Sequence, residues 1–285
     1  MFAEIKSRAF ITIAGPDRAA FLQGLLTNDV AGLMPGSAQA TFLLSPQGKI
    51  LFDLMLVNAG EHFSLECESA RRDELIAKFQ QYKLRAKIAL AADDALSLHA
   101  HFGSQAPVPP TATGSINFID PRLSALGTRV LGPRKLVADA ISHSGLKTAP
   151  EAHYADYRTS LGVAEGSTEL GIEKLFMLEA NAEELHGVDF QKGCYVGQEL
   201  TSRMKRKAEL KKRLLPLDVG SKPDIGAPVI AGDEQLGSVI GVRGTIAFAL
   251  LRLDRLNAAR ADGTQIFAGP IPATLRVPGY LRNLD

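Results

Sequence analysis

The sequence predicts an α+β protein that ends in a small antiparallel β domain. The chain has 285 residues, a length typical of about two domains. Its first hundred residues mix strand-like alternation with helical spacing of apolar side chains. From about residue 214, short apolar stretches alternate with Gly, Pro and Asp turns, which is typical of a small antiparallel barrel or sandwich. These three observations define the expected fold class.

The expected elements follow from these patterns in chain order. A helix is expected after Pro16, since proline favours the first helical turn, and another is expected around Phe79. A third helix is expected at 151–161, with Gly162 ending it. The expected strands of this half are 9–14, 38–45, 50–58, 84–90 and 95–102. The expected strands of the C-terminal part are 214–219, 227–231, 236–242, 246–253 and 273–277.

Three of these segments carry side chains of interest. The apolar run at 50–58 contains Asp53, a carboxylate that must be paired or face a cavity, because burying it bare is costly. Alternation over 84–90 would place Arg85 and Lys87 on one strand face. We expect His99 and His101 to lie on a solvated strand face. The segment 103–115 has three prolines and no charge and is predicted to be an inserted loop.

Composition and charge exclude several classes of protein. The net charge of +1 argues against a protein that coats nucleic acid or an anionic membrane. No apolar run reaches the roughly 18 residues of a membrane-spanning helix, and the first residues do not read as a secretory signal. The two cysteines, Cys67 and Cys194, give no disulfide framework or zinc-finger spacing. The simplest expectation is a cytoplasmic protein. The run 203–213, with seven basic residues and one acid, is either a solvated face or a site for an anion.

The most informative segment is 190–203, with the sequence FQKGCYVGQELTSR. Gly193 would allow a tight turn just before Cys194, and a helix is expected over 196–204. A thiol at a helix N-terminus beside a lysine, here Lys192, has a depressed pKa and is a nucleophile or metal ligand. The alternative is that Cys194 is a small buried residue in a tight corner.

The octet K-G-C-Y-V-G-Q-E resembles the signature of the YgfZ family of folate-binding proteins, which serve in iron–sulfur cluster assembly and repair. That family is related to the glycine cleavage T-protein, an aminomethyltransferase that uses tetrahydrofolate. Further segments share the likeness. They are Phe21–Gly24, Thr27–Val30, Ser45–Ile50, Tyr82–Lys87, Tyr157-Arg158, Gly162–Gly166 and Leu178–Asn181.

The resemblance implies ring-like α+β lobes around a central folate channel, with a C-terminal antiparallel β-barrel. It implies a folate-binding region at 1–205 and a barrel at 206–285. Cys194 and Lys192 would carry the chemistry. Glu179 would accept hydrogen bonds from the pterin, with a surface glutamate as the alternative, and Asp53 would face its reactive end or act as a structural acceptor. Arg85 and Lys87 would receive the anionic tail. The other signature residues are Gly193, Tyr195, Gly197, Gln198, Glu199 and Arg203.

The resemblance implies a tetrahydrofolate-binding accessory protein whose partners are folate and iron–sulfur assembly or client proteins. Two alternatives stay open: a folate-dependent aminomethyl transferase, and a cysteine-dependent thiol enzyme using a histidine such as His186. The related transferases carry paired aspartates on the hairpin strand, whereas this chain has Phe52-Asp53, so enzymatic activity is left open. A cluster normally takes four thiolates, so two distant cysteines predict no cluster of the protein's own. No resident metal site is expected.

Overall fold

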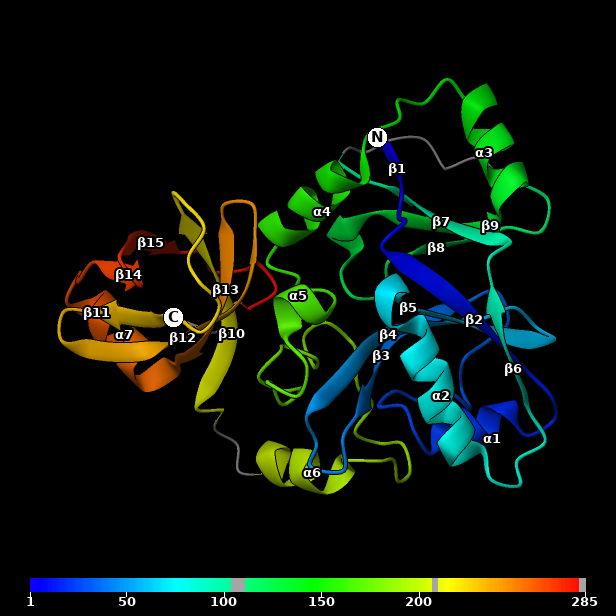
Figure 1. Cartoon of the computed structure of the whole chain (residues 1–285), viewed down its shortest axis with the longest axis horizontal. Coiled ribbons are helices and arrows are strands. Elements are labelled where there is room, and N and C mark those ends of the chain that lie inside the picture. The colour runs from blue at the N-terminus through cyan, green and yellow to red at the C-terminus, as the bar shows by residue number, and fades with distance from the viewer. Residues whose placement is uncertain (104–110, 207–209, 282–285) are drawn as a thin grey trace. The chain divides into compact units, whose positions relative to one another are not determined.

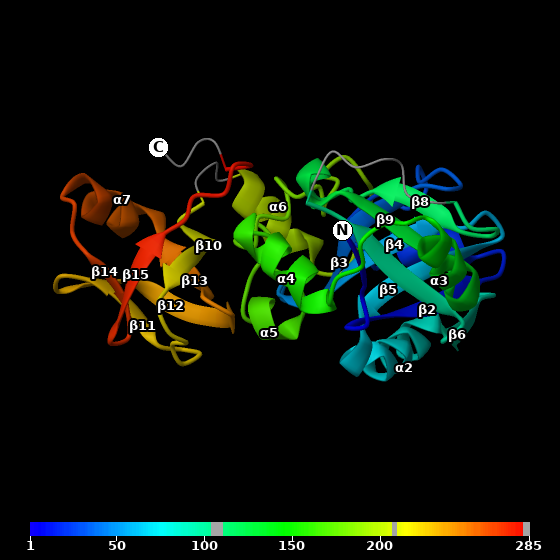
Figure 2. The ribbon, with the colours of Figure 1, turned by 90° about the horizontal axis from the view of Figure 1, so that it is seen from above.

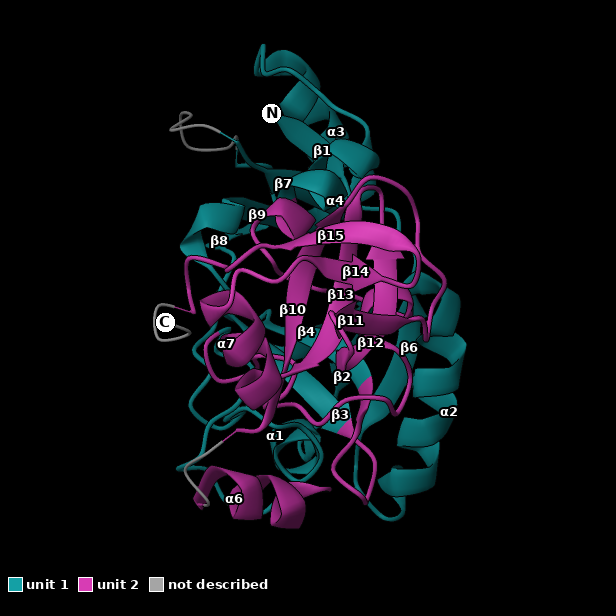
Figure 3. Ribbon diagram, turned by 90° about the vertical axis from the view of Figure 1, so that its left-hand side faces the viewer, with its two compact units in different colours: residues 1–43, 52–157, 185–196 teal, residues 44–51, 158–184, 197–285 magenta. Residues whose placement is uncertain are grey.

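The structure, a computed structural model, describes residues 1–103, 111–206 and 210–281. The chain forms two compact units, coloured separately in Figure 3. The first unit comprises 1–43, 52–157 and 185–196, and the second comprises 44–51, 158–184 and 197–285. Residues 104–110 of the expected 103–115 loop, and 207–209 of the basic run, lie outside the described residues.

Two sheets form the framework of the first unit, with strand orders β3-β4-β5-β2-β6 and β1-β7-β9-β8. The residues at the turn end of the β3–β4 hairpin, 44–51, are grouped with the second unit. The strands of the first sheet are β2 (Arg8–Ala14), β3 (Ala38–Leu44), β4 (Ile50–Asn58), β5 (His62–Glu68) and β6 (Ala89–Asp93). Those of the second are β1 (Phe2–Glu4), β7 (Leu96–His101), β8 (Ile116–Ile119) and β9 (Thr128–Pro133).

Helices cover these sheets and complete the core of the first unit. The helix α2 (Arg72–Lys83) packs against β2 and β6 (Figure 2), and α3 (Arg134–His143) packs against β7 and β9 (Figure 1). The short α1 (Arg18–Gln23) follows β2, and α4 (Glu151–Ser160) carries the chain toward the second unit. Both sheets contribute side chains to one buried cluster, which includes Phe10, Met55, Leu98, Leu131 and Tyr154. The core of this unit therefore lies between its sheets.

A closed barrel with the strand order β10-β13-β12-β11-β14-β15 dominates the second unit. Its strands are β10 (Lys212–Val219), β11 (Pro228–Ala231), β12 (Glu234–Arg243), β13 (Ile246–Arg252), β14 (Ile266–Ala268) and β15 (Ile271–Leu275). The helix α7 (Leu253–Ala261), which the sequence did not predict, adds Leu256 to the barrel core. Full closure leaves the barrel without sheet edges. The predicted α+β class with an antiparallel C-terminal barrel is confirmed.

The segment 158–184 belongs with the barrel. The Leu214 amide donates to the Glu179 carbonyl (2.7 Å), and the Asn181 side chain donates back to the Leu214 carbonyl (3.0 Å). The Tyr280 hydroxyl donates to the Gly162 carbonyl (2.7 Å). The unit also contains α5 (Ser167–Leu170) and α6 (Gln198–Arg206). The division of the chain at residue 206 stays a prediction.

Candidate functional site

The side chain of Lys192 anchors the signature segment in the first unit. Lys192 is 8% exposed. Its ammonium group donates to three backbone carbonyls, those of Gln23 (2.9 Å), Leu26 (2.5 Å) and Asn28 (2.8 Å). These carbonyls lie at and just after the C-terminal end of α1, where a helix presents unpaired oxygens and attracts cations. The lysine therefore caps α1 from a segment far along the chain.

Backbone hydrogen bonds fasten the same segment on both sides of Cys194. The Asp189 amide donates to the Thr27 carbonyl (3.2 Å), and the Val196 amide donates to the Gly24 carbonyl (3.2 Å). Cys194 itself is exposed. The structure thus presents a solvent-accessible thiol on a loop whose two ends are fixed.

The expected helix position relative to Cys194 is wrong. The helix α6 begins at Gln198, four residues after the cysteine, so the thiol does not lie at a helix N-terminus. Gly193 has open space where a Cβ would lie, whereas Gly197 has φ +81° and a Cβ there would lie 2.6 Å from the Ser45 carbonyl. The tight turn therefore falls at Gly197, because this left-handed residue stops the helix from extending toward Cys194.

The geometry of Lys192 also changes what it can do for Cys194. An ammonium group has three N–H bonds, and each is directed at one of the three carbonyls. None remains for a hydrogen bond to the thiol. Burial lowers the pKa of Lys192 to about 8, against the opposing effect of Asp29 and Asp189. Its catalytic role beside Cys194 stays a prediction, and its observed contacts are those of an anchor.

Two sequence motifs meet in the second unit. A Cβ at Gly48, in the hairpin turn, would lie 3.1 Å from the Gly197 carbonyl of the signature and 3.5 Å from the Leu200 Cβ. Beyond this contact, Gln198 and Glu199 begin α6, and Arg203 pairs with Glu199 across one helical turn (3.0 Å). This exposed pair is typical of a solvated helix surface. Tyr195, in the first unit, is buried.

Glu179 is buried, so the alternative expectation, that it is a surface glutamate, is wrong. One carboxylate oxygen, Oε2, accepts a hydrogen bond from the Phe176 amide (3.0 Å). Burial raises the pKa of Glu179, while the Phe176 amide and the cations Lys49 and Lys212 oppose that rise. The Lys49 ammonium lies 3.5 Å from the centroid of the Phe176 ring. A buried carboxylate beside cations has the acceptor chemistry to recognise a ring that presents adjacent N–H donors.

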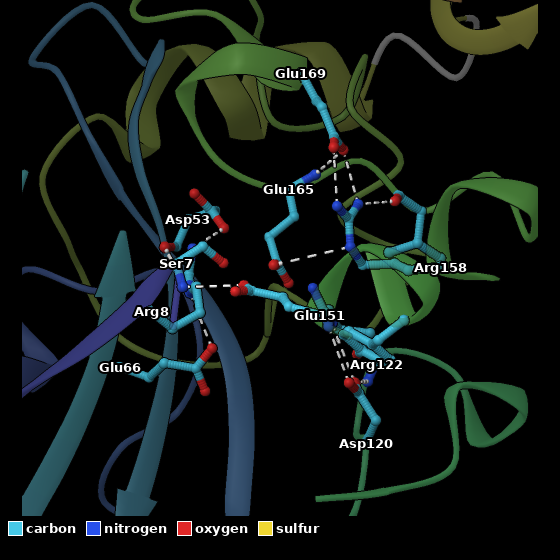
Figure 4. A network of polar contacts seen from close by, with 12 residues as sticks. Ser7, Arg8, Asp53, Glu66, Asp120, Arg122, Glu151, Arg158, Glu165 and Glu169 are labelled. Carbon is cyan, nitrogen blue, oxygen red and sulfur yellow. Dashed lines mark hydrogen bonds and ion pairs between the residues drawn. The ribbon is translucent and has the colours of Figure 1, made fainter. Parts of the chain in front are cut away.

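Asp53 is paired, as its place in an apolar strand required. Arg8 donates to the Asp53 carboxylate (2.9 Å) and to the Asp53 carbonyl (3.0 Å), as Figure 4 shows. The Nε of Arg8 also donates to Glu66 (2.9 Å). This guanidinium therefore joins carboxylates on two neighbouring strands of the first unit, β4 and β5.

The pairing continues through a buried network that the sequence did not reveal. Arg129 donates to Glu66 (2.8 Å) and, through Nε, to Asp120 (2.7 Å). Asp120 also accepts from Arg122 (2.9 Å), and the two arginines hold the pKa of Asp120 at about 2 despite its burial. With Arg8 and Asp53 included, these contacts link three guanidinium groups to three carboxylates.

The second unit holds a buried ion pair of its own. Arg158 forms two parallel hydrogen bonds with the Glu169 carboxylate (2.7 and 2.8 Å), and the Glu165 amide donates to the same carboxylate (2.9 Å). Bidentate pairs of this kind are strong and directional. They fix the 158–169 segment. The sequence resemblance included Arg158 and Glu165 without assigning them this role, and it did not include Glu169.

The expected strand at 84–90 is wrong. The helix α2 ends at Lys83, β6 begins at Ala89, and Arg85 and Lys87 are exposed in the connection between them. The Lys87 amide donates to the Asp17 carboxylate (2.7 Å) instead of to a neighbouring strand. Leu84 has φ +43°, which is incompatible with extended backbone. The alternation of polar and apolar residues over 84–90 therefore lies mostly in a loop and does not mark a strand.

The expectation of a solvated face for His99 and His101 is also wrong. Both are buried on β7, and the His101 ring stacks on Phe2 with centroids 4.6 Å apart. The helix α3 packs against β7 and β9, and the strand β1 pairs with β7 at the edge of the same sheet.

The predicted site residues divide between the two units. Those in the first unit are Asp53, Arg85, Lys87, Lys192, Gly193, Cys194 and Tyr195. Those in the second are Glu179, Gly197, Gln198, Glu199 and Arg203. Within the described residues there is no group of three or more His, Cys, Asp or Glu side chains able to hold a metal ion. Across that same part of the chain, no helix is long and apolar enough to cross a membrane.

Comparison with known proteins relates both the barrel and the whole fold to described families. The C-terminal β-barrel domain of CAF17 matches residues 211–283. The crystal structure of the glycine cleavage system aminomethyltransferase T from Bartonella henselae aligns with a TM-score of 0.73 and 15% identity, over 98% of this chain and 86% of that one. At this identity the likeness establishes the fold alone, and it confirms the expected aminomethyltransferase-type fold.

Relatives in sequence carry a common name. The protein from Pyricularia oryzae, named iron-sulfur cluster assembly factor IBA57 homolog, mitochondrial, is 35% identical over 75% of this chain and 56% of its own length. The chain therefore spans little more than half the length of this relative. The human iron-sulfur cluster assembly factor IBA57, mitochondrial, is 30% identical over 94% of this chain and 83% of its own length.

These names correct one expectation and refine another. The predicted cytoplasmic location is wrong by this comparison, because the named relatives from fungi, mouse and human are mitochondrial proteins. The YgfZ resemblance is a coarser statement of the same relationship. With 83% of the human protein covered at 30% identity, the chain belongs to the family of the iron–sulfur cluster assembly factor IBA57.

Proposed function

We propose that this protein is a tetrahydrofolate-binding accessory protein for iron–sulfur cluster assembly or repair, and that Cys194 is its reactive group. The relatives are named for iron–sulfur cluster assembly. The observation that carries the proposal is the exposed thiol of Cys194 on a loop anchored by Lys192. Thiolates are the usual protein ligands of iron–sulfur clusters.

The second cysteine does not complete a cluster site. Cys67 is fully buried in β5, and burial raises the pKa of its thiol to about 12. A thiol of that kind is inert. A cluster is therefore cargo that Cys194 contacts while other ligands come from a partner protein or a small thiol. This arrangement fits an accessory protein that works on the clusters of assembly or client proteins.

The residues proposed for folate have the chemistry that folate requires. The pterin presents adjacent N–H donors, and Glu179 offers a buried carboxylate whose Oε2 holds the Phe176 amide. The carboxylate retains acceptor capacity, because each of its oxygens has two lone pairs. The exposed cations Arg85 and Lys87 suit the anionic glutamate tail. In this proposal folate is bound and oriented by the chain.

The aminomethyl transferase alternative is weakened by the environment of Asp53. Its carboxylate already accepts from Arg8, and the same guanidinium holds Glu66. The thiol-enzyme alternative needs a histidine at Cys194. Among the described residues, no histidine nitrogen is hydrogen-bonded to that thiol, and His186 is exposed.

The decisive experiment uses cells that lack the gene, complemented with the wild-type chain, Cys194→Ser or Cys67→Ser. The readout is the activity of iron–sulfur enzymes at matched protein levels. We expect Cys194→Ser to fail and Cys67→Ser to restore activity. Full activity with Cys194→Ser would refute the role of the thiol.

Folate binding is tested separately by calorimetry with tetrahydrofolate, using wild-type protein, Glu179→Gln and Cys194→Ser. We expect Glu179→Gln to bind about tenfold or more weakly, the usual loss with a charged hydrogen-bond partner. Cys194→Ser should bind as wild type does. Unchanged affinity in Glu179→Gln would mean that another group recognises the pterin. Turnover of an aminomethyl donor in the same samples would instead favour the transferase.

A further inference from the structure

The first unit contains a groove of about 510 Å³ between α3 and the start of α4. The helix α3 lines one side, residues 148–151 line the other, and β1 and β7 contribute the residues between them. None of the lining residues belongs to the proposed folate and thiol sites. The volume is within the usual range for small-molecule sites.

Much of the lining is apolar. Phe2 and Ile141 belong to one buried cluster between β1 and α3. Ala138, Ala149 and Pro150 complete this apolar part of the lining. The part of a ligand that covers these residues must itself be apolar, because a polar group buried without a partner is costly.

The groove carries an excess of positive charge around Glu4. The Glu4 carboxylate pairs with Arg134, the first residue of α3, and lies 3.8 Å from the Lys6 ammonium. Two cations therefore surround one carboxylate. Lys6 lines the groove, and its side chain is 73% exposed with no second carboxylate beside it among the described residues. Its ammonium is therefore able to bind the anionic group of a ligand.

Glu151, the first residue of α4, brings a negative charge to the same groove. Its carboxylate accepts the backbone amides of Lys6 (3.1 Å) and Ser7 (2.9 Å), and Figure 4 shows the second contact. These neutral donors hold the carboxylate in place, and no cation pairs with it in the described part of the chain. Each oxygen keeps a second lone pair for a further donor.

The two opposite charges lie close together. The backbone amide of Lys6 holds the Glu151 carboxylate, and the side chain of the same lysine carries the ammonium. The two groups are therefore at most one lysine side chain and one hydrogen bond apart. A ligand that carries an ammonium and a carboxylate on one carbon atom is short enough to pair with both.

We propose that this groove binds a free α-amino acid with a large apolar side chain. The ligand carboxylate would pair with Lys6 and its ammonium with Glu151, while its side chain would contact Phe2 and Ile141. A zwitterion complements both charges of the groove, whereas a ligand with a single charge leaves one of them without a partner.

L-Phenylalanine is the probe, and two analogues that each lack one of its charges are the controls. Phenethylamine has no carboxylate, and 3-phenylpropionate has no ammonium. Binding is followed in the whole protein by two-dimensional NMR of the backbone amides of α3 and of residues 148 and 149. We expect saturable shifts with millimolar L-phenylalanine and about fivefold weaker binding of each analogue, the upper range for an exposed ion pair. Absence of saturable shifts, or equal binding of the three compounds, would overturn the proposal.

Two substitutions test which group meets each charge of the ligand. Lys6→Met should weaken L-phenylalanine binding about fivefold and should not weaken phenethylamine binding, because that analogue has no carboxylate. Glu151→Gln should weaken L-phenylalanine binding by a similar factor and should not weaken 3-phenylpropionate binding, because that analogue has no ammonium. L-Phenylalanine affinity unchanged by both substitutions, or an equal loss for all three compounds, would contradict the pairing.

Two variants on α3 test the location. Ala138 lines the groove and is exposed, so Ala138→Trp would fill it without disturbing the core. Leu136, on the same helix, does not line it and is 43% exposed, so Leu136→Trp is the matched control. We expect Ala138→Trp to weaken L-phenylalanine binding about tenfold or more through steric clash, and Leu136→Trp to change it less than about twofold. Unchanged binding in Ala138→Trp would place the amino acid elsewhere and refute the site.

Discussion

Replacing Lys192 with methionine isolates the anchor of the signature loop, because methionine keeps the length of the side chain and removes its charge. Hydrogen bonds to a charged donor contribute about 1.5–3 kcal/mol each, so the three carbonyl contacts amount to roughly 5–9 kcal/mol in gross terms. Burial lowers the pKa of Lys192 from 10.5 to about 8. This lowering is the net effect of burial and of the opposing attraction of Asp29 and Asp189, and the net penalty on the charged form, roughly 3 kcal/mol, disappears with the charge. The expected loss of unfolding free energy is therefore roughly 2–6 kcal/mol.

Urea unfolding followed by circular dichroism measures this loss, and Lys6→Met is the matched control. The Lys6 side chain is 73% exposed and pairs only loosely with Glu4, so its loss should be below about 0.5 kcal/mol. Lys192→Arg should not restore stability, because a planar guanidinium does not converge on three carbonyls as an ammonium does. If Lys192→Met unfolds at the same urea concentration as Lys6→Met, the ammonium is not the anchor and the reasoning fails.

Three further predictions concern a turn, the two thiols and the buried network. Gly197→Ala should cost about 1–3 kcal/mol in urea unfolding, because of its positive φ and the nearby Ser45 carbonyl, whereas Gly193→Ala should be neutral. Iodoacetamide at pH 8 should add one group, to Cys194, and mass spectrometry should find Cys67 modified only in denatured protein, since burial raises its pKa to about 12. The pKa of Asp120 is about 2 in the folded protein against an ordinary value of 3.8. The ionised carboxylate therefore stabilises the fold above about pH 4, and this stabilisation is lost as the pH falls toward 2. In Asp120→Asn, the free energy of unfolding measured in urea should depend less on pH between 4 and 2 than in the wild type.

Local sequence patterns predicted much of the fold. Short apolar stretches separated by turn residues identified five of the six strands of the closed barrel. The three-residue strand β14 (Ile266–Ala268) was missed, because it is too short to show alternation. The helix α7 escaped notice because Leu256 and Ala259, its buried residues, are too few for a clear apolar stripe. The segment 84–90 was wrongly predicted as a strand, although its local pattern was clear. It had the right period, yet Leu84 adopts a positive φ and Lys87 hydrogen-bonds to Asp17, which lies 70 residues earlier.

The site was less predictable because its contacts are long-range. The exposed Cys194 was expected, but the partners of Lys192 lie 164 to 169 residues earlier in the chain. The spacing within the signature predicted that Lys192 would lower the pKa of the Cys194 thiol. In the structure the Lys192 ammonium instead caps the C-terminal end of α1. The burial of His99 likewise depends on β1 and α3, which no local signal connects to β7.

Two residues of the signature hold the loop of Cys194 in place. Lys192 fixes the loop to the end of α1, and Gly197 permits the turn before α6. Cys194 is the exposed group between them. A thiol that shares a cluster with ligands from another molecule must be ordered each time the two meet, and a flexible loop would lose conformational entropy at every encounter. A loop that is already fixed avoids that loss while leaving the sulfur accessible, which is what the transient coordination proposed for Cys194 requires. The same rigidity would bring little to a residue that only fills a corner of the core.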